Sequence, residues 1–268
     1  MTALMSRVVP PVPFSRGRAM SLVERNFLVY RRGWLVFVSG FFEPLFYLLS
    51  VGVGISVLTG DITLADGVAV SYTAFIAPAM MASSAMNGAM FDATFNVFFK
   101  LKYAKLYDAV LATPVTPRDV AVGEITWALL RGLCYAVSFF VVMLAMDLVR
   151  SWWSILTVPA AVLIGFAFAA VCMAGTTYMR TWQDFEFITM SLMPMFLFSA
   201  TFFPLSTYPG PLQVVVQLTP LYHGVALLRG FTTGLVGVGM LVHVAYLLVM
   251  GFVGVYFASR RLERLLLT

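Results

Sequence analysis

Charged residues are scarce in this 268-residue chain, at 11% against the roughly 25% that is typical of soluble domains. Apolar residues make up 61% of the chain, and the mean hydropathy is +0.92. A single globular core could not bury so much apolar surface, so lipid must be the solvent for most of it. The composition excludes a soluble enzyme and an intrinsically disordered chain, and it predicts an integral membrane protein.

The chain also lacks the motifs of a catalytic protein. Lysine occurs only as Lys100, Lys102 and Lys105 and never follows a glycine, so there is no Gly-x-x-x-x-Gly-Lys-Ser/Thr phosphate-binding loop. No Ser-His-Asp, His-Glu-x-x-His or paired-carboxylate pattern lies on a polar loop. We therefore expect no enzymatic activity and no cofactor on this chain.

Cysteine is nearly absent as well. Cys134 and Cys172 lie in apolar runs at different expected depths, which predicts neither a disulfide nor a metal site. The 17 Lys and Arg residues outnumber the 12 Asp and Glu residues, but they lie between apolar runs rather than on one polar face. This distribution is typical of membrane topology and not of a nucleic-acid partner.

The N-terminus lacks a signal-peptide pattern, because no apolar core with a small-residue cleavage site follows its first arginines. We expect residues 1–20 to form a disordered basic cytoplasmic tail, residues 21–264 one transmembrane domain, and residues 265–268 a short C-terminal tail. Ser21 and Glu24 have the spacing of a capping box, which predicts a helix over residues 22–31.

Six apolar stretches are long enough to cross a bilayer, which takes about 20 helical residues. These stretches are residues 34–58, 70–97, 120–146, 153–178, 185–203 and 238–258. Fourteen Lys and Arg residues then lie on one side and only Arg150 and Arg229 on the other, with Arg131 inside a span. By the positive-inside rule both termini are cytoplasmic. The predicted fold class is an all-α integral membrane protein with six transmembrane helices.

Residues 204–234 are apolar but too broken to form a seventh span. Four prolines interrupt them and leave short helical pieces such as residues 212–218 and 221–229. A seventh span would also place the basic C-terminus outside, against the charge rule. We expect an external re-entrant cap that protein shields from lipid.

The loop between the second and third spans contains an amphipathic pattern. Apolar or aromatic side chains recur at helical spacing and are Tyr103, Leu106, Tyr107, Val110 and Leu111. Lysines, among them Lys102, occupy the rest of this stretch. The pattern predicts a helix over residues 99–112, either an interfacial helix that binds anionic membrane lipids or a coupling helix that docks into a soluble partner. A new helix is expected to open at Thr116, with Pro117 first and Asp119 completing the cap.

Ionisable residues inside the spans need a partner or water, because a charge at the bilayer centre costs about 2.5–3.5 kcal/mol or more. Glu43 and Arg131 have similar expected depths, so we predict that they pair, either as a static contact or in the transport path. Asp92 and Glu124 lie nearer the interface and are expected to be solvated. Asn87 is expected at a close helix contact or in a cavity wall.

Several motifs resemble those of permeases of the type-two ABC exporter family. They are Met86-Asn87-Gly88-Ala89, residues 98–103 (FFKLKY), 107–114 (YDAVLATP), 123–125 (GEI), 178–185 (YMRTWQDF), 198–205 (FSATFFPL) and 218–224 (LTPLYHG). Within that family the chain is most similar to NodJ-type lipooligosaccharide exporter subunits, with daunorubicin-resistance permeases more distant. The resemblance implies a bacterial cytoplasmic membrane protein with six spans, a coupling helix after the second span and an external cap.

The resemblance also implies partners. Two P-loop ATPase subunits would bind ATP and Mg²⁺, and a second permease chain, expected to be identical, would complete the transporter. The implied cargo is an amphipathic lipid, a glycolipid or lipooligosaccharide, or a hydrophobic drug. An ion-coupled carrier and a non-transporting membrane scaffold remain open as alternatives. The coupling assignment predicts that Tyr107→Ala uncouples ATP hydrolysis from transport with little loss of folding.

Overall fold

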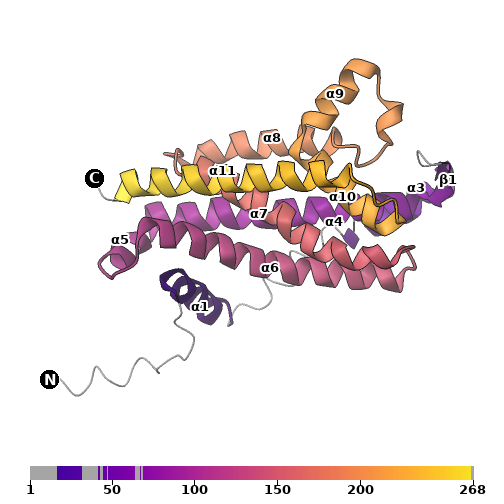
Figure 1. Cartoon of the computed structure of the whole chain (residues 1–268). Helices are drawn as coiled ribbons and strands as arrows, with labels where there is room; N and C mark the ends of the chain where they lie inside the picture. The colour runs from indigo at the N-terminus through magenta and orange to yellow at the C-terminus, as the bar shows by residue number, and fades with distance from the viewer. Residues whose placement is uncertain are drawn as a thin grey trace.

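The computed structural model describes residues 17–31, 42, 45–46, 48–63, 67 and 69–266, and nearly all of them are helical. Its long helices are α4 (Tyr72–Phe91), α6 (Pro117–Ala145), α7 (Thr157–Thr176) and α11 (Met240–Leu266). These helices form a bundle in which α7 packs against each of the other three (Figure 1). The core therefore lies around α7.

Shorter elements flank this bundle and place the loops at its two ends (Figure 1). They are α1 (Arg18–Tyr30), the π-helical η2 (Leu48–Val53), α3 (Gly54–Thr59), β1 (Asp61–Thr63), β2 (Ala69–Ser71), the π-helical η3 (Asp92–Asn96) and η4 (Phe99–Tyr103), α5 (Leu106–Leu111), η5 (Trp152–Leu156), η6 (Trp182–Asp184), α8 (Phe185–Leu197), η7 (Leu205–Thr207), α9 (Gly210–Leu218) and α10 (Pro220–Thr233). The terminal end of the bundle carries α1, α5 and the end of α11. The hairpin end carries the β1–β2 hairpin and the start of α11.

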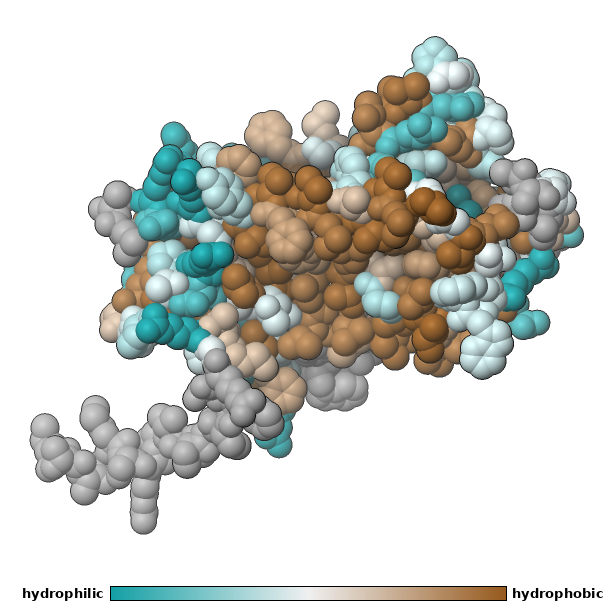
Figure 2. All heavy atoms as spheres, viewed as in Figure 1, coloured by the Kyte–Doolittle hydropathy of each residue, from teal (hydrophilic) through white to brown (hydrophobic). Residues whose placement is uncertain are grey.

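The surface of the bundle is suited to a bilayer. Among the described residues, three helical segments are long and apolar enough to cross a membrane: Pro117–Ala145, Trp152–Thr176 and Met240–Leu266. The pair α9 and α10 passes the same test only together, with a bend of 90° between them. A broad apolar band crosses the middle of the molecule, and polar residues gather at both ends (Figure 2). A mostly helical membrane protein is confirmed, whereas the six-span count, the side of each terminus and the external cap stay predictions.

The helices in two of the expected spans end at other residues than the apolar stretches do. The stretch 185–203 stops being helical at Leu197, because the backbone leaves the helical region at Phe198 and turns left-handed at Ala200 with φ 53°. The stretch 238–258 extends to Leu266, because arginines after the apolar run are good helix formers and suit a helix C-terminus. Most of the expected first span, residues 34–58, lies outside the described residues before Leu48.

The first helix begins earlier than the capping-box pattern predicted. Gly17 has extended backbone and serves as the N-cap of α1, so the helix starts at Arg18. Ser21 lies inside the first turns and its hydroxyl donates to the carbonyl of Arg18 instead of capping the helix. The predicted capping box at Ser21 is therefore wrong.

The hairpin end contains a small sheet that the all-α expectation omitted. Strands β1 and β2 pair antiparallel, with Ile62 opposite Val70. Directly before β1, Gly60 ends α3 with φ 66°, a conformation that glycine adopts without strain. The two helical pieces expected within residues 204–234 are confirmed as α9 and α10, and α10 packs against α4, α7 and α11.

The start of α6 has the predicted capping box. The backbone N–H of Asp119 donates to the Thr116 hydroxyl at 3.2 Å, and the Thr116 N–H donates to the Asp119 carboxylate at 2.9 Å. The Thr116 hydroxyl, which donates to the same carboxylate at 2.7 Å, and then the Thr116 N–H hold the pKa of Asp119 below its usual value. The cap therefore stabilises α6 at neutral pH, and this stabilisation is lost as the pH falls through the lowered pKa of Asp119.

Replacing Asp119 with Ala is expected to destabilise the chain by about 1 kcal/mol, because the backbone N–H and the hydroxyl of Thr116 lose their carboxylate acceptor. Thermal unfolding of the purified chain in detergent measures the effect. Asp108→Ala is the control, because Asp108 is an exposed carboxylate in the preceding helix. Equal losses from both substitutions would contradict the capping role.

Helices α7 and α11 approach each other through glycines. A Cβ atom at Gly254 would lie 2.6 Å from both the carbonyl carbon of Ala170 and the amide nitrogen of Val171. A Cβ at Gly251 would lie 2.2 Å from the Phe166 ring. Small residues let two helices pack backbone to backbone in a membrane, where apolar side chains gain little from leaving lipid.

Candidate functional site

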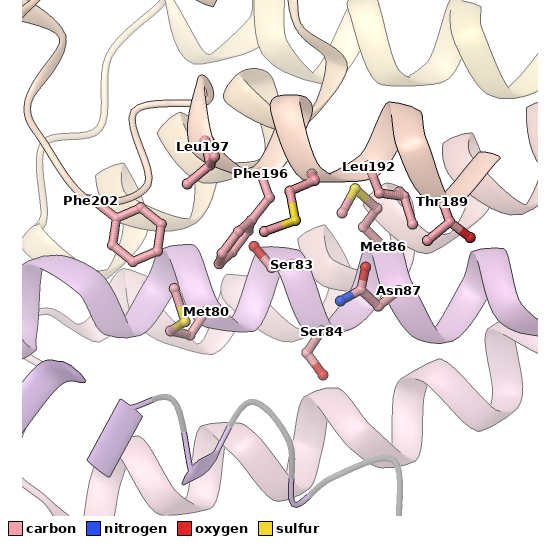
Figure 3. A pocket seen from close by; sticks show the side chains of 11 residues that line it. Met80, Ser83, Ser84, Met86, Asn87, Thr189, Leu192, Phe196, Leu197 and Phe202 are labelled. Carbon is pink, nitrogen blue, oxygen red and sulfur yellow. The ribbon is translucent and has the colours of Figure 1, made fainter. Parts of the chain in front are cut away.

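A pocket of 360 Å³ lies between α4 and α8 (Figure 3). Its wall is formed by Met80, Ser83, Ser84, Met86, Asn87, Thr189, Leu192, Met193, Phe196, Leu197 and Phe202. Figure 3 shows side chains of α8 facing those of α4 across the space. The wall is mainly apolar, and its polar groups are one carboxamide and three hydroxyls. Such a surface binds apolar chains or rings and orients them with a few hydrogen bonds.

Asn87 lies in this pocket wall, so the structure favours the cavity position over the packing position for its side chain. The neighbouring Gly88 has the packing role, since a Cβ there would contact the Tyr135 ring of α6 at 3.4 Å. Consecutive residues of α4 thus serve two faces, one towards α8 and one towards α6. Small and polar residues clustered within an apolar stretch are the sequence signal for both roles, the cavity wall and the close helix contact.

A buried polar cluster lies at the terminal end of the bundle and joins three elements. Lys100 of η4 donates to both carboxylate oxygens of Glu124 in α6, at 2.9 and 2.7 Å. It also donates to Asn26 of α1 at 3.2 Å, and the Asn26 amide donates to Glu124 at 3.1 Å. All three residues are buried, with at most 8% of their surface exposed. Each charge is compensated, as burial requires.

A second buried ion pair joins η3 to α6. Nη1 of Arg131 is 2.8 Å from a carboxylate oxygen of Asp92, and Nε of Arg131 donates to the Tyr135 hydroxyl at 3.1 Å. Asp92 is the first residue of the π-helical turn η3, and π-turns interrupt regular helices at functional positions. The expectation that Asp92 and Glu124 are solvated is wrong, because each is only 4% exposed and is paired with a cation.

The predicted partner of Arg131, Glu43, lies outside the described residues. A Glu43–Arg131 contact therefore stays a prediction. Within the described part of the chain, Arg131 pairs with Asp92, a residue that the depth comparison had placed nearer the interface than Arg131. Lys100, Asn26 and Glu124 were not selected from the sequence as a set, because their contacts join residues as many as 98 positions apart.

The segment between α4 and α6 is broken, contrary to the single helix predicted over residues 99–112. Helical structure continues from α4 through η3 and η4 to Tyr103, and α5 begins only at Leu106. Lys105 separates them with left-handed backbone, φ 44° and ψ 33°. Left-handed backbone cannot continue a right-handed helix, so Tyr103 and the α5 residues do not share one stripe.

The predicted coupling residues differ in exposure. Lys102 and Tyr103 are exposed, whereas Leu106, Val110 and Leu111 are half-buried. Tyr107 is fully buried in an apolar cluster with Leu22 of α1, Val120 of α6 and Leu262 of α11, among other residues. Burial first, and the Glu124 charge second, raise the pKa of Tyr107 well above its usual value, so the phenol stays protonated. Four elements therefore converge on this ring at the terminal end.

Tyr107→Ala is expected to destabilise the chain by about 3 kcal/mol, since it leaves a cavity in this cluster. This expected loss of stability replaces the sequence-based prediction that Tyr107→Ala has little effect on folding. Tyr107→Phe keeps the ring and is the matched control, with an expected loss below about 1 kcal/mol. Thermal unfolding of both variants measures the difference. A fully stable Tyr107→Ala variant would show that the ring does not support the fold.

Known proteins match this chain over nearly its whole length. The family described as ABC-2 type transporter matches residues 18–232, from the first residue of α1 into α10. Nodulation protein J of Rhizobium meliloti (strain 1021) is 30% identical over 264 residues, covering 97% of this chain and 98% of that protein. Nodulation protein J of Sinorhizobium fredii (strain NBRC 101917 / NGR234) is 28% identical over 268 residues, covering 99% of this chain and all of that protein (100%).

A third relative agrees with these two. Nodulation protein J of Rhizobium leguminosarum bv. viciae is 30% identical over 252 residues, covering 91% of this chain and 95% of that protein. The family match includes both buried ion pairs and the whole pocket between α4 and α8. From the apolar bundle and these matches together, the chain belongs to the ABC-2 type transporter family and is a membrane permease of that family.

Proposed function

We propose that the chain is the membrane subunit of an ATP-driven exporter that moves an amphipathic lipid, a glycolipid or lipooligosaccharide, or a hydrophobic drug out across the bacterial cytoplasmic membrane. The pocket between α4 and α8 is the observation that carries this proposal. Its apolar wall suits an acyl chain, and its carboxamide and hydroxyls suit the polar part of an amphiphile. The similarity to proteins named Nodulation protein J supports the lipooligosaccharide among these cargoes.

The energy source in this proposal is a pair of partner ATPase subunits. The chain has no phosphate-binding loop, so ATP and Mg²⁺ would be bound by the partners. We place their contact on the exposed residues Lys102 and Tyr103 and on the outer surface of α5. The basic residues of this segment also suit anionic lipid headgroups at the membrane surface.

The second membrane chain is proposed to be an identical copy. The face of α8 that points away from the bundle is apolar and exposed, with Phe187 73% and Met190 77% accessible. A second copy that covers this face would enclose the pocket beside it. Symmetric pairing is the common arrangement of homo-oligomers, and each surface then contacts its own counterpart.

Motion at the partner contact would reach the pocket through the buried polar cluster. Lys100 lies two residues before Lys102 on the same helical segment and is bonded to α6 and α1. That segment continues directly from α4, which forms one wall of the pocket. A displacement of residues 102–111 therefore moves α4 relative to α8 and changes the shape of the pocket, provided that the Lys100–Glu124 ion pair holds η4 and α6 together.

Filling the pocket tests this function. Ser83→Phe places a ring among the lining residues, and it is expected to reduce cargo export at least about tenfold while the partner still hydrolyses ATP. Export from vesicles that contain the reconstituted complex, with hydrolysis measured in parallel, gives both values. Ser138→Phe is the matched control, because Ser138 lies on the exposed surface of α6. Normal export by Ser83→Phe would contradict the pocket as the cargo path.

A further inference from the structure

A second cavity, of 370 Å³, lies at the hairpin end of the bundle, away from the pocket between α4 and α8. Its wall comes from α10, from the first turn of α11 and from the loop that follows α8. Arg229 of α10 reaches this cavity, together with Tyr222 and His243. A cation, a phenol and an imidazole thus share one hollow in an otherwise apolar region.

The protein holds the Arg229 side chain in a fixed position. Its Nη2 donates to the carbonyl of Ala200 at 3.0 Å, and its Nε donates to the carbonyl of Phe75 at 3.4 Å. The guanidinium also lies over the Phe75 ring, 3.7 Å from the ring centroid. These contacts orient a planar fork of donors, which is the geometry that binds phosphate or carboxylate through two parallel hydrogen bonds.

The positive charge of Arg229 is not balanced within the described part of the chain. The two ion pairs in that part are Lys100–Glu124 and Arg131–Asp92, and neither includes Arg229. The groups that contact its guanidinium are the neutral carbonyls of Phe75 and Ala200 and the Phe75 ring. A half-buried cation in apolar surroundings is expensive without a counter-charge, so an anion that enters the cavity would be strongly attracted.

The cavity has room for such a group. Gly237 and Gly239 line it, and a Cβ atom built at either position meets nothing within 4 Å. The Nδ1 atom of His243 is engaged with Nδ1 of His223 at 2.7 Å, which fixes the imidazole in the wall. Tyr222 adds a hydroxyl donor on the same side as Arg229. The site therefore offers several donors and no carboxylate from the residues that line it.

We propose that this cavity binds an anionic group, a phosphate, sulfate or carboxylate, that is carried by an amphiphile or is free in solution. Arg229 supplies the charge and the directional hydrogen bonds, Tyr222 a further donor, and the glycines the space. Under the proposed orientation the site opens on the side of the membrane opposite to the ATPase partners. Binding here does not depend on the proposed export function, because it requires neither ATP nor a partner.

Ligand titrations of the purified full-length chain in an uncharged detergent test the site. The probes are dioctanoyl phosphatidic acid, inorganic phosphate and dioctanoyl phosphatidylcholine, and the measured quantity is the concentration that half-saturates the rise in unfolding temperature. We expect saturable stabilisation by phosphatidic acid and at least about tenfold weaker binding by the Arg229→Gln variant. The Arg150→Gln variant is the matched control, because Arg150 is an exposed arginine at the same end that donates to the carbonyl of Ala69. It should bind within about twofold of the unmodified chain.

The outcomes separate the sources of the anion. Stabilisation by phosphatidic acid alone would show that the bound anion is carried by a lipid. Stabilisation by inorganic phosphate as well would show that a free anion also binds. Both outcomes support the site. Equal binding of phosphatidylcholine, or unchanged binding by Arg229→Gln, would overturn it. If Arg229→Gln does not fold, Gly239→Leu decides, since it adds a bulky side chain at the wall of the cavity and leaves Arg229 in place. Unweakened binding by Gly239→Leu would then refute the proposal.

Discussion

Gly254→Val is expected to prevent folding of the chain, with a cost above about 4 kcal/mol. The first added carbon would lie 2.6 Å from two backbone atoms of α7, and backbone cannot move aside as a side chain can. The substitution therefore forces α11 away from α7 at a point where the two backbones lie close together. The measurement is the yield of monodisperse protein extracted from membranes, followed by its unfolding temperature.

The control for this prediction is Gly132→Val on α6. A Cβ at Gly132 meets nothing within 4 Å, so the same chemical change adds volume where there is space. We expect an effect within about 0.5 kcal/mol, because β-branched residues cost little in a helix apart from packing. Similar yields from the two variants would show that α7 and α11 do not depend on this close approach.

Lys100→Met is expected to destabilise the chain by about 3–5 kcal/mol, because it leaves the Glu124 carboxylate buried without its cation. Asn26 would remain as a neutral donor to this carboxylate, and Glu124 is only 4% exposed. The double variant Lys100→Met/Glu124→Leu removes both charges and should recover most of the loss. Thermal unfolding of the single and double variants in one detergent gives the coupling between the two positions.

Lys102→Met is the matched control, since Lys102 is exposed and lies two residues away on the same segment. It should leave the unfolding temperature nearly unchanged, as is usual for surface charges. If Lys102→Met were as harmful as Lys100→Met, the loss would come from the net charge of the segment. If the stability lost by the double variant equalled the sum of the losses of the two single variants, Lys100 and Glu124 would not stabilise the fold as a pair.

The long helices could be predicted from the sequence because local signals define them. The Thr116–Asp119 cap marks the start of α6, and a mainly apolar stretch continues the helix over its 29 residues. The prolines within residues 204–234 likewise separate α9 from α10, since a helix seldom continues through proline. Such signals lie within a few residues of the feature that they predict.

The break at Lys105 could not be predicted in this way. Residues 103–111 keep a helical spacing of apolar side chains, and lysine is a good helix former. The left-handed turn arises because α5 packs Tyr107 into a cluster shared with α1, α6 and α11. Those contacts join distant parts of the chain, so tertiary packing overrides the local pattern.

The ion partners were missed for a related reason. Depth was counted along regular helices at about 1.5 Å per residue, which placed Asp92 near the interface. The π-helical turn at Asp92–Asn96 and the neighbouring α6 instead bury that carboxylate beside Arg131. The Lys100–Glu124 contact spans 24 residues and two elements. Charges in an apolar run signal that a partner is needed, but the choice among partners needs the fold.

The most direct test of the central claim is to extract the chain gently from its native membrane and identify what is bound to it. We predict a stoichiometric P-loop ATPase that is lost from the Tyr103→Glu variant, which places a carboxylate on the exposed coupling segment. Trp152→Glu is the matched control, because Trp152 is also an exposed aromatic residue, 96% accessible against 61% for Tyr103, and lies at the hairpin end; this variant should retain the ATPase. A chain that carries no ATPase in several mild detergents would contradict an ATP-driven exporter.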